Sequence, residues 1–85
     1  MKEIRIIGLL ISDRIKEAGK TQDILTRYAH MIKSRLGFHE VSEDVCSRLG
    51  IIILQLTGEP EEFDRLESEL KTIGGLEIQH MIFKT

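Results

Sequence analysis

Three segments of the chain are strongly apolar and have the alternation of strands. Alternation over residues 3–12 divides the side chains into two apolar sets, with Ile4, Ile6 and Leu10 on one face and Ile7, Leu9 and Ile11 on the other. A strand that is apolar on both faces is typical of the middle of a sheet. Residues 51–57 repeat this two-sided pattern, and residues 76–83 form a third apolar segment. The sequence therefore predicts strands in these three places.

A helix is indicated between the first two strands. Its apolar residues recur on one side of a helix: Ile24, Leu25, Tyr28, Ile32 and Leu36. The polar residues 13–20 before this stripe are expected to form a loop or a frayed helix start. Thr21 or Asp23 is expected to cap the helix, and Gly37 to end it.

A second helix is indicated from Pro60 onward. Proline suits the first helical position, because its missing N–H has no partner to lose there. Acidic residues follow in the first turn and match the positive end of the helix dipole. The apolar stripe of this helix consists of Phe63, Leu66, Leu70 and Ile73. Gly74 and Gly75 are expected to end it.

The order of these segments predicts the fold. A weaker strand over residues 38–43 and a turn over residues 44–50 complete the order β-α-β-β-α-β. Right-handed crossovers then place both helices on one face of a four-stranded antiparallel sheet, with the first and third strands at its centre. This is the α+β, ferredoxin-like arrangement. We expect residues 1–85 to form a single domain, because no linker or low-complexity stretch interrupts them.

The sheet face without helices is expected to be apolar. Polar residues mark this face at Arg5, Gln55, Glu77 and Gln79. The large apolar residues of the same parity are Ile7, Leu9, Ile11, Ile51, Ile53, Met81 and Phe83. Such a patch exceeds what a soluble monomer normally exposes, so we expect a homodimer or homotetramer that buries it. If one strand has the opposite parity, its other face is apolar as well, and a patch survives.

Composition narrows the range of functions. The chain has 12 basic and 14 acidic residues, a formal charge of −2, which argues against direct nucleic-acid binding. Its one cysteine excludes a disulfide within the chain and suits a reducing cytoplasm. The apolar run at residues 6–11 is too short to span a bilayer and lacks a cleavage site after it, so we expect neither a membrane anchor nor a signal peptide.

Candidate chemistry is sparse, and we predict no catalytic residue and no cofactor. Cys46 and His39 could face each other across a hairpin as nucleophile and base, but a structural cysteine fits the pattern better. Alternatively, His39, Cys46 and His80 supply the soft ligands that nickel or zinc prefers. The two histidines are expected on opposite edge strands, so only an interface between chains could join them at one ion.

Three runs carry a family resemblance: IKSRLGFH at residues 32–39, GIIILQLTG at 50–58 and IGGLEI at 73–78. With them the chain resembles the iron-only hydrogenase system regulators. That family is similar in fold to the C-terminal domain of the nickel-responsive regulator and, more distantly, to ACT domains. The resemblance implies an ACT-like regulatory domain with a transcriptional or hydrogenase-linked role. It also implies a small-molecule effector near the first strand–helix connection, where Ser12, Asp13, Gly19 and Lys20 are candidate contacts.

The nickel-responsive relatives bind metal through a His-x-His pair with a nearby cysteine, and they carry a ribbon-helix-helix DNA-binding segment. Here no second histidine lies two residues from His39, and no such segment precedes the first predicted strand. We therefore expect a regulatory module without direct DNA binding.

Overall fold

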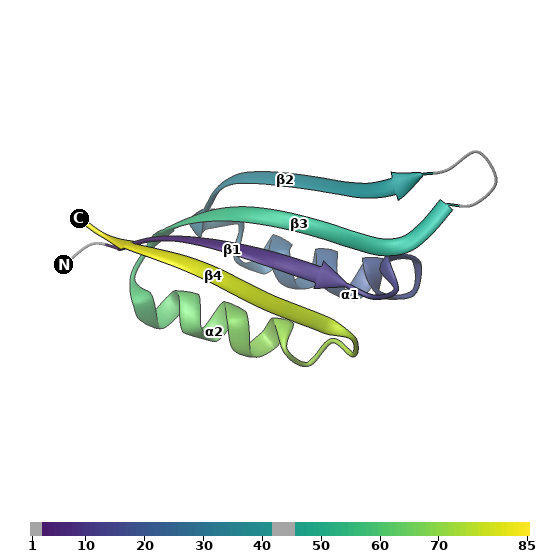
Figure 1. Ribbon diagram of the computed structural model, residues 1–85. Coiled ribbons are helices and arrows are strands. Elements are labelled where there is room, and N and C mark those ends of the chain that lie inside the picture. Colours follow the sequence, from purple (N-terminus) through teal and green to yellow (C-terminus); the bar gives the residue numbers. More distant parts are fainter. Residues whose placement is uncertain (1–2, 42–45) are drawn as a thin grey trace.

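The chain forms a four-stranded antiparallel sheet with two helices on one face, as a computed structural model shows (Figure 1). The structure describes residues 3–41 and 46–85, with backbone only for 38–41 and 46–48. The strands are β1 (Glu3–Ile11), β2 (Ile32–Val41), β3 (Cys46–Gly58) and β4 (Leu76–Lys84), and the helices are α1 (Arg14–Arg27), η1 (Ala29–Met31, 3₁₀) and α2 (Pro60–Leu70). This confirms the predicted α+β, ferredoxin-like fold.

The strand order is β2-β3-β1-β4, so the two strands predicted for the centre are the central pair. Ile7 of β1 lies opposite Leu54 of β3 on one side and His80 of β4 on the other. Glu3 pairs with Lys84, so the described chain begins and ends at the same end of the sheet, as Figure 1 shows. Among the described residues, no helix is long and apolar enough to cross a membrane.

The hydrophobic core lies between the sheet and the helices. The largest fully buried side chains come from both layers: Ile7, Leu9, Leu54 and Leu56 from the sheet, Phe63, Leu66 and Leu70 from α2, and Met31 from η1. Pro60 occupies the first turn of α2, and the whole predicted stripe is buried. The helix ends at Leu70, so the end predicted at Gly74 and Gly75 is wrong and Ile73 lies beyond the helix. Burial of a leucine- or phenylalanine-sized side chain contributes about 1.5–3 kcal/mol, so this stripe fixes α2 against the sheet.

The first helix differs from its prediction at both ends. It starts at Arg14, because the Asp13 side chain caps it by accepting a hydrogen bond from the Lys16 N–H at 3.1 Å. The cap predicted at Thr21 or Asp23 is therefore wrong, and so is a loop through residue 20. The helix ends at Arg27, whereas the prediction extended it to Leu36.

A β-bulge explains the false helical spacing at the end of that stripe. The pairing of β2 with β3 shifts register between Ile32 and Ser34, which leaves Lys33 as an extra residue. Ile32 packs against the core, while Leu36 lies opposite Ile53 and is 59% exposed. Ile32 and Leu36 are four positions apart, which is the interval expected of one helix face. Because of the bulge they instead lie on opposite faces of a strand. The prediction for β3 began too late, at residue 51, whereas the strand begins at Cys46. The predicted turn falls partly on residues 44–45, outside the described residues.

The face predicted for β1 is wrong. Ile7, Leu9 and Ile11 face the helices and are buried, so they are core residues and not part of the uncovered sheet face. Arg5, which was taken to mark the uncovered face, is buried beside them. The other apolar set of β1 faces outward instead: Ile4, Ile6 and Leu10, each partly exposed.

Arg5 turns inward because an ionic cluster surrounds it. Its Nε donates to Glu3 at 3.0 Å, and its Nη1 donates to Glu67 at 2.5 Å and to Asp64 at 3.1 Å. The guanidinium carbon also lies 5.2 Å from the centre of the Phe63 ring. Burial alone would lower the pKa of Arg5, but hydrogen bonds to Asp64, Glu67 and Glu3 outweigh it and raise the pKa. A charged residue inside the fold is therefore matched by carboxylates there.

Candidate functional site

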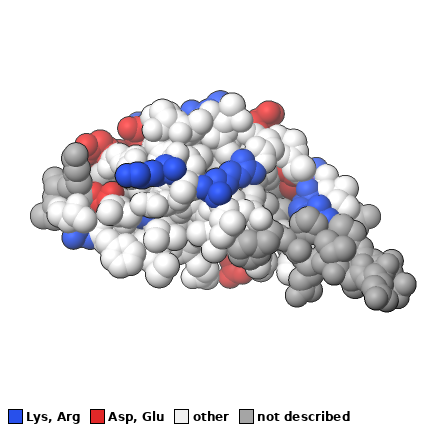
Figure 2. Space-filling view, turned by 90° about the horizontal axis from the view of Figure 1, so that it is seen from above, with Lys and Arg blue, Asp and Glu red and all other residues white. Residues whose placement is uncertain are grey.

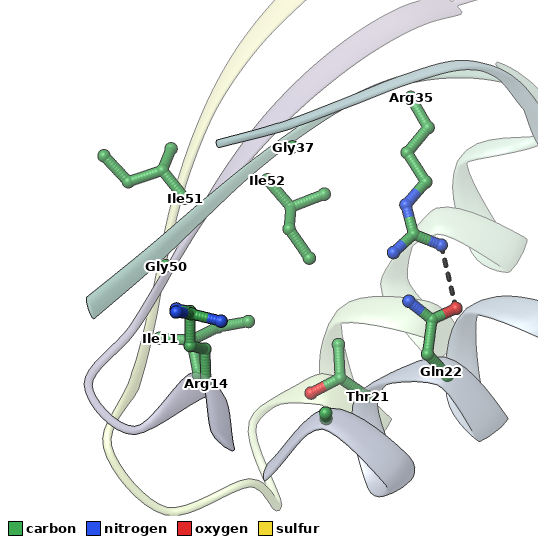
Figure 3. A pocket seen from close by; sticks show the side chains of 10 residues that line it. Ile11, Arg14, Thr21, Gln22, Arg35, Gly37, Gly50, Ile51 and Ile52 are labelled. Atoms are coloured by element: carbon green, nitrogen blue, oxygen red, sulfur yellow. Dashed lines mark hydrogen bonds between the residues drawn. The ribbon is translucent and has the colours of Figure 1, made fainter. Parts of the chain in front are cut away.

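A hollow of about 250 Å³ lies between α1 and strands β2 and β3 (Figure 3). Helix α1 supplies Arg14, Thr21 and Gln22 to its lining, and Arg35 reaches toward them from β2. Ile11, Ala18 and Ile52 contribute apolar surface. The hollow therefore combines basic, hydroxyl and amide groups over an apolar base.

Glycines leave room for this hollow. Gly37 of β2 and Gly50 of β3 both line it, and neither has a side chain to fill it. A Cβ on Gly50 would lie 3.1 Å from the Arg14 Cβ and 3.3 Å from its Cδ, which is tighter than ordinary packing. Glycine at position 50 therefore allows the Arg14 stem to lie directly against β3.

Arg35 and Thr21 both line the hollow, but only Arg35 has a described hydrogen-bond partner. Arg35 Nη1 donates to the Gln22 Oε1 at 2.9 Å, which joins β2 to α1 across the hollow. Thr21 is only 2% exposed, and its Oγ1 has no hydrogen-bond partner among the described residues. In Figure 3 this oxygen turns toward the side of the hollow where Arg14 lies. A buried hydroxyl without a partner costs about 1–3 kcal/mol, so this oxygen is an exception that needs a physical reason.

The charge around the hollow is predominantly basic. Its described lining residues include Arg14 and Arg35 but no carboxylate, histidine or cysteine. Figure 2 looks onto the β2 side of the molecule and shows basic side chains in the middle, with acidic ones mostly toward the margins. The guanidinium, hydroxyl and amide groups of this lining can donate hydrogen bonds to a bound molecule.

None of the residues predicted for an effector loop lines the hollow, and their role as effector contacts stays a prediction. The Ser12 side chain and backbone N–H both donate to the Gly75 carbonyl oxygen, at 2.8 and 3.1 Å. Asp13 caps α1, as described above. Gly19 and Lys20 lie within α1, so their placement in a loop is wrong. Lys20 donates to the carbonyl of Thr72 at 3.2 Å, toward the connection that follows α2.

The predicted metal ligands lie where the topology anticipated. His39 is on β2 opposite Gly50, Cys46 begins β3, and His80 is on β4, the other edge strand. His80 Nδ1 lies 3.4 Å from a carboxylate oxygen of Glu67. Within the part of the chain that the structure describes, no group of three His, Cys, Asp or Glu side chains could hold a metal ion. A nickel or zinc site shared between chains stays a prediction.

The uncovered sheet face is apolar, although its membership differs from the prediction. Four of the predicted residues lie on it: Ile51, Ile53, Met81 and Phe83. The outward set of β1 and Leu36 of β2 replace the three buried residues of β1. We call this surface the open face. Over Gly8, which has no side chain, the open face carries a shallow depression bordered by Ile6, Ile53 and Met81.

Sequence reasoning missed the hollow because it misplaced β2. Arg35 falls within the helix predicted to end at Gly37, whereas it lies on a strand opposite Leu54 and reaches α1. Thr21 was interpreted as a helix cap, whereas it lies in the middle of α1. The signal that could have revealed the site is the pair Gly37 and Gly50, two glycines within strands that leave space beside a helix.

No model of a known family matches the chain, and no curated protein matches its sequence. Solved structures do share its fold, and none of the three described here is named as a hydrogenase regulator. The uncharacterized protein TM1266 from Thermotoga maritima is 24% identical over 99% of this chain and 100% of that chain, with a TM-score of 0.82.

Two further similar structures have names that refer to a function. One is CPII from Thiomonas intermedia K12, a nitrogen regulatory PII-like protein bound to ADP, AMP and bicarbonate. It is 12% identical over 98% of this chain and 92% of that chain, with a TM-score of 0.60. The other is the divalent ion tolerance protein CutA1 from Ehrlichia chaffeensis, 18% identical over 100% of this chain and 85% of that chain, with a TM-score of 0.57. These similarities show a shared ferredoxin-like fold.

Proposed function

We propose that the chain is a non-catalytic regulatory module that assembles with itself through the open face and senses a small molecule. The observation that carries this proposal is the exposure of large apolar side chains on one sheet face. Leu36, Met81 and Phe83 are each more than half exposed, and Ile53 in the centre is 38% exposed. Exposed apolar patches of this extent mark interaction sites.

The size of the open face suits a dimer. Strands of nine residues, such as β1 and β4, extend about 30 Å at ~3.3 Å per residue. Four strands spaced about 4.8 Å apart extend about 19 Å across, so the face covers roughly 600 Å². Two such faces together bury roughly 1,200 Å², the lower end of the range for specific interfaces.

The chemistry of the open face favours a second copy of the chain as its partner. On β1, β3 and β4 the described outward positions carry one charged residue, Glu77, so the face lacks the charge that would recognise a nucleic acid or another strongly charged partner. Self-complementary, two-fold interfaces are the commonest way in which identical chains assemble. The depression over Gly8 gives a facing apolar side chain a place to insert.

The sensing part of the proposal is supported by the hollow and by the fold. The lining of the hollow consists of binding groups, and the PII-like protein of the same fold is a nitrogen regulator solved with bound nucleotides and bicarbonate. We further propose that the module acts in the cytoplasm, consistent with its single cysteine, and serves an iron-only hydrogenase system. Neighbouring hydrogenase-maturation genes would support that last assignment, and their absence from every genome carrying the gene would contradict it.

The molar mass in solution tests the assembly. Sedimentation of the native chain at micromolar concentration should give a multiple of the monomer mass. Ile53→Glu places a charge at the centre of the open face, where burial in an interface would be costly, and should yield monomers. Ile15→Glu is the matched control, because Ile15 is 57% exposed on α1, away from the open face. A monomeric native chain would overturn the proposed assembly.

A further inference from the structure

We propose that the hollow between α1, β2 and β3 binds a small molecule through its anionic oxygens, those of a carboxylate or a phosphate group. This inference rests on the proposed function, because it names the chemical class of the molecule that the module senses. Three observations carry it: the donors that line the hollow, the unpartnered hydroxyl of Thr21, and the size of the space.

The donors come from two elements that meet only in the folded chain. Arg14 and Arg35 bring guanidinium groups to one hollow, from α1 and from β2. A guanidinium presents a planar fork of N–H donors that matches the two oxygens of a carboxylate or phosphate. Two guanidinium groups that line the same hollow repel each other, and a bound anion offsets that repulsion. The residues that line the hollow in the described part of the chain include no carboxylate.

Thr21 is the independent observation. A threonine inside a helix ordinarily satisfies its hydroxyl by donating to the carbonyl one turn earlier. Here the side chain is 98% buried, yet its Oγ1 has no partner among the described residues and borders the hollow. A hydroxyl can donate to an anionic oxygen, and such a charge-assisted hydrogen bond is about twice as strong as a neutral one. A bound anion would therefore supply the hydrogen-bond partner that the buried Thr21 hydroxyl lacks among the described residues.

Arg35 differs from Arg5 in its hydrogen-bond partner. Where this fold buries an arginine for stability, three carboxylates surround it within 3.1 Å. At the hollow, Arg35 donates to the neutral amide of Gln22 instead, which orients its guanidinium without neutralising it. Orientation without neutralisation is the arrangement that an anion-binding site requires.

The volume limits the ligand. About 250 Å³ is enough for one oxyanion group and a short organic part. The apolar side chains of Ile11 and Ile52 lie where this organic part would rest. A small carboxylic acid or a small phosphorylated molecule fits these limits.

The test is an NMR titration of the ¹⁵N-labelled native chain with two probes in separate arms, inorganic phosphate and succinate, at constant pH and ionic strength. Binding in the hollow should shift the amide resonances of Thr21, Gln22 and Arg35 and leave those of α2 unchanged. The arm with the tighter saturation identifies phosphate or carboxylate as the recognised group. If neither probe shifts these resonances at millimolar concentration, the inference is wrong.

Matched variants separate a built site from general attraction of anions. Arg35→Gln should weaken binding of the better probe by about tenfold to a hundredfold, the range for losing a charged hydrogen bond. Arg27→Gln removes the same charge from an exposed ion pair with Glu69 and should leave binding unchanged. Equal weakening by both variants would overturn the inference.

Thr21→Val provides a second readout that a structural role would not produce. It replaces the hydroxyl by a methyl of nearly the same shape, so the fold should be retained and resist urea at least as well as the native chain. Binding of the better probe should nevertheless weaken about threefold or more, whereas Thr21→Ser should keep it. Unchanged binding in Thr21→Val would remove the hydroxyl from the site and overturn the inference. Because the mass is measured without ligand, an assembled chain that binds neither probe would overturn only this inference, and a monomer that binds one would overturn only the assembly.

Discussion

The two ends of β1 handle positive charge in opposite ways. Near its start, Arg5 is enclosed by Glu3, Asp64 and Glu67, and its side chain is 8% exposed. Just beyond its end, Arg14 lines a hollow together with Arg35, and none of the described lining residues is acidic. Both ends lie on the helix-covered side of one small sheet. The local chemistry, and not the fold, therefore decides whether an arginine serves stability or binding.

The difference has a physical origin in what packs above each end. Helix α2 places Asp64 and Glu67 over the start of β1, so a charge there is matched within the chain. At the other end, glycines at positions 37 and 50 keep β2 and β3 from filling the space beside α1. The first arrangement is complete by itself. The second is arranged to be completed by a molecule from outside.

Removal of Arg5 should have the largest effect on stability. Arg5→Ala leaves the buried Glu3 and Glu67 without the guanidinium, and breaking such a pair costs about 3–5 kcal/mol of unfolding free energy. Urea denaturation followed by circular dichroism measures this loss. Because total stabilities are about 5–15 kcal/mol, Arg5→Lys should be measured beside it, since it keeps the charge and should lose less.

The same kind of change at the hollow is the control for this prediction. Arg35→Ala removes an exposed guanidinium whose one described hydrogen bond is to an amide, so it should change stability by no more than about 0.5 kcal/mol. If Arg35→Ala and Arg5→Ala destabilised the chain equally, the distinction between a structural and a binding end would fail.

A methyl group at Gly50 should have an effect of intermediate size. It should weaken anion binding more than it lowers the stability of the fold. In Gly50→Ala the new Cβ would lie 3.1 Å from the Cβ of Arg14, so the Arg14 side chain has to move away from β3. We expect phosphate or succinate affinity to fall several-fold while the unfolding free energy changes by less than about 1 kcal/mol. Gly74→Ala is the matched control, because nothing lies within 4 Å of its added Cβ. Unchanged affinity in Gly50→Ala would show that Arg14 does not need this position.

Patterns that are local in sequence predicted the fold well. The two-sided apolar character of β1 and β3 identified the central strands, and Pro60 with its following stripe identified α2. The prediction of the first helix was wrong at its C-terminal end, because one extra residue, Lys33, shifts the alternation of β2. No local signal in the sequence distinguishes this bulge from helical spacing.

Interactions between distant residues could not be predicted in the same way. Arg5 faces inward because it meets Asp64 and Glu67, which lie 59 and 62 positions away. An arginine in an alternating strand otherwise indicates the solvent side. The hollow is formed by residues of α1, β2 and β3, and two of these residues are glycines without side chains to fill it. A local sequence pattern can identify each element, but it does not show that these residues lie side by side in the fold.

The pair of Arg27 with Glu69 is intermediate between these two ends, and loss of the hydrogen bond from Tyr28 to Glu69 should have the smallest effect. Its Nη1 donates to Glu69 at 2.5 Å in an exposed pair, and the Tyr28 hydroxyl donates to the other oxygen of Glu69. The hydrogen bond from Tyr28, and then that from Arg27, lowers the pKa of Glu69. The hydrogen bond to Glu69, and then burial and the Glu69 charge, raises the pKa of Tyr28.

The signs of these shifts predict how Tyr28→Phe depends on pH. A lowered pKa of Glu69 in the fold contributes stability above its ordinary value of 4.5, and this is lost as the pH falls through the folded value. A raised pKa of Tyr28 contributes stability below 10.0 that is lost as the pH rises through the folded value. The melting temperatures of native chain and variant should therefore differ slightly between about pH 6 and 9 and converge toward both extremes. In a Glu69→Gln background the difference should not vary with acid pH, and a constant gap in the native background would show that the Tyr28–Glu69 hydrogen bond does not contribute.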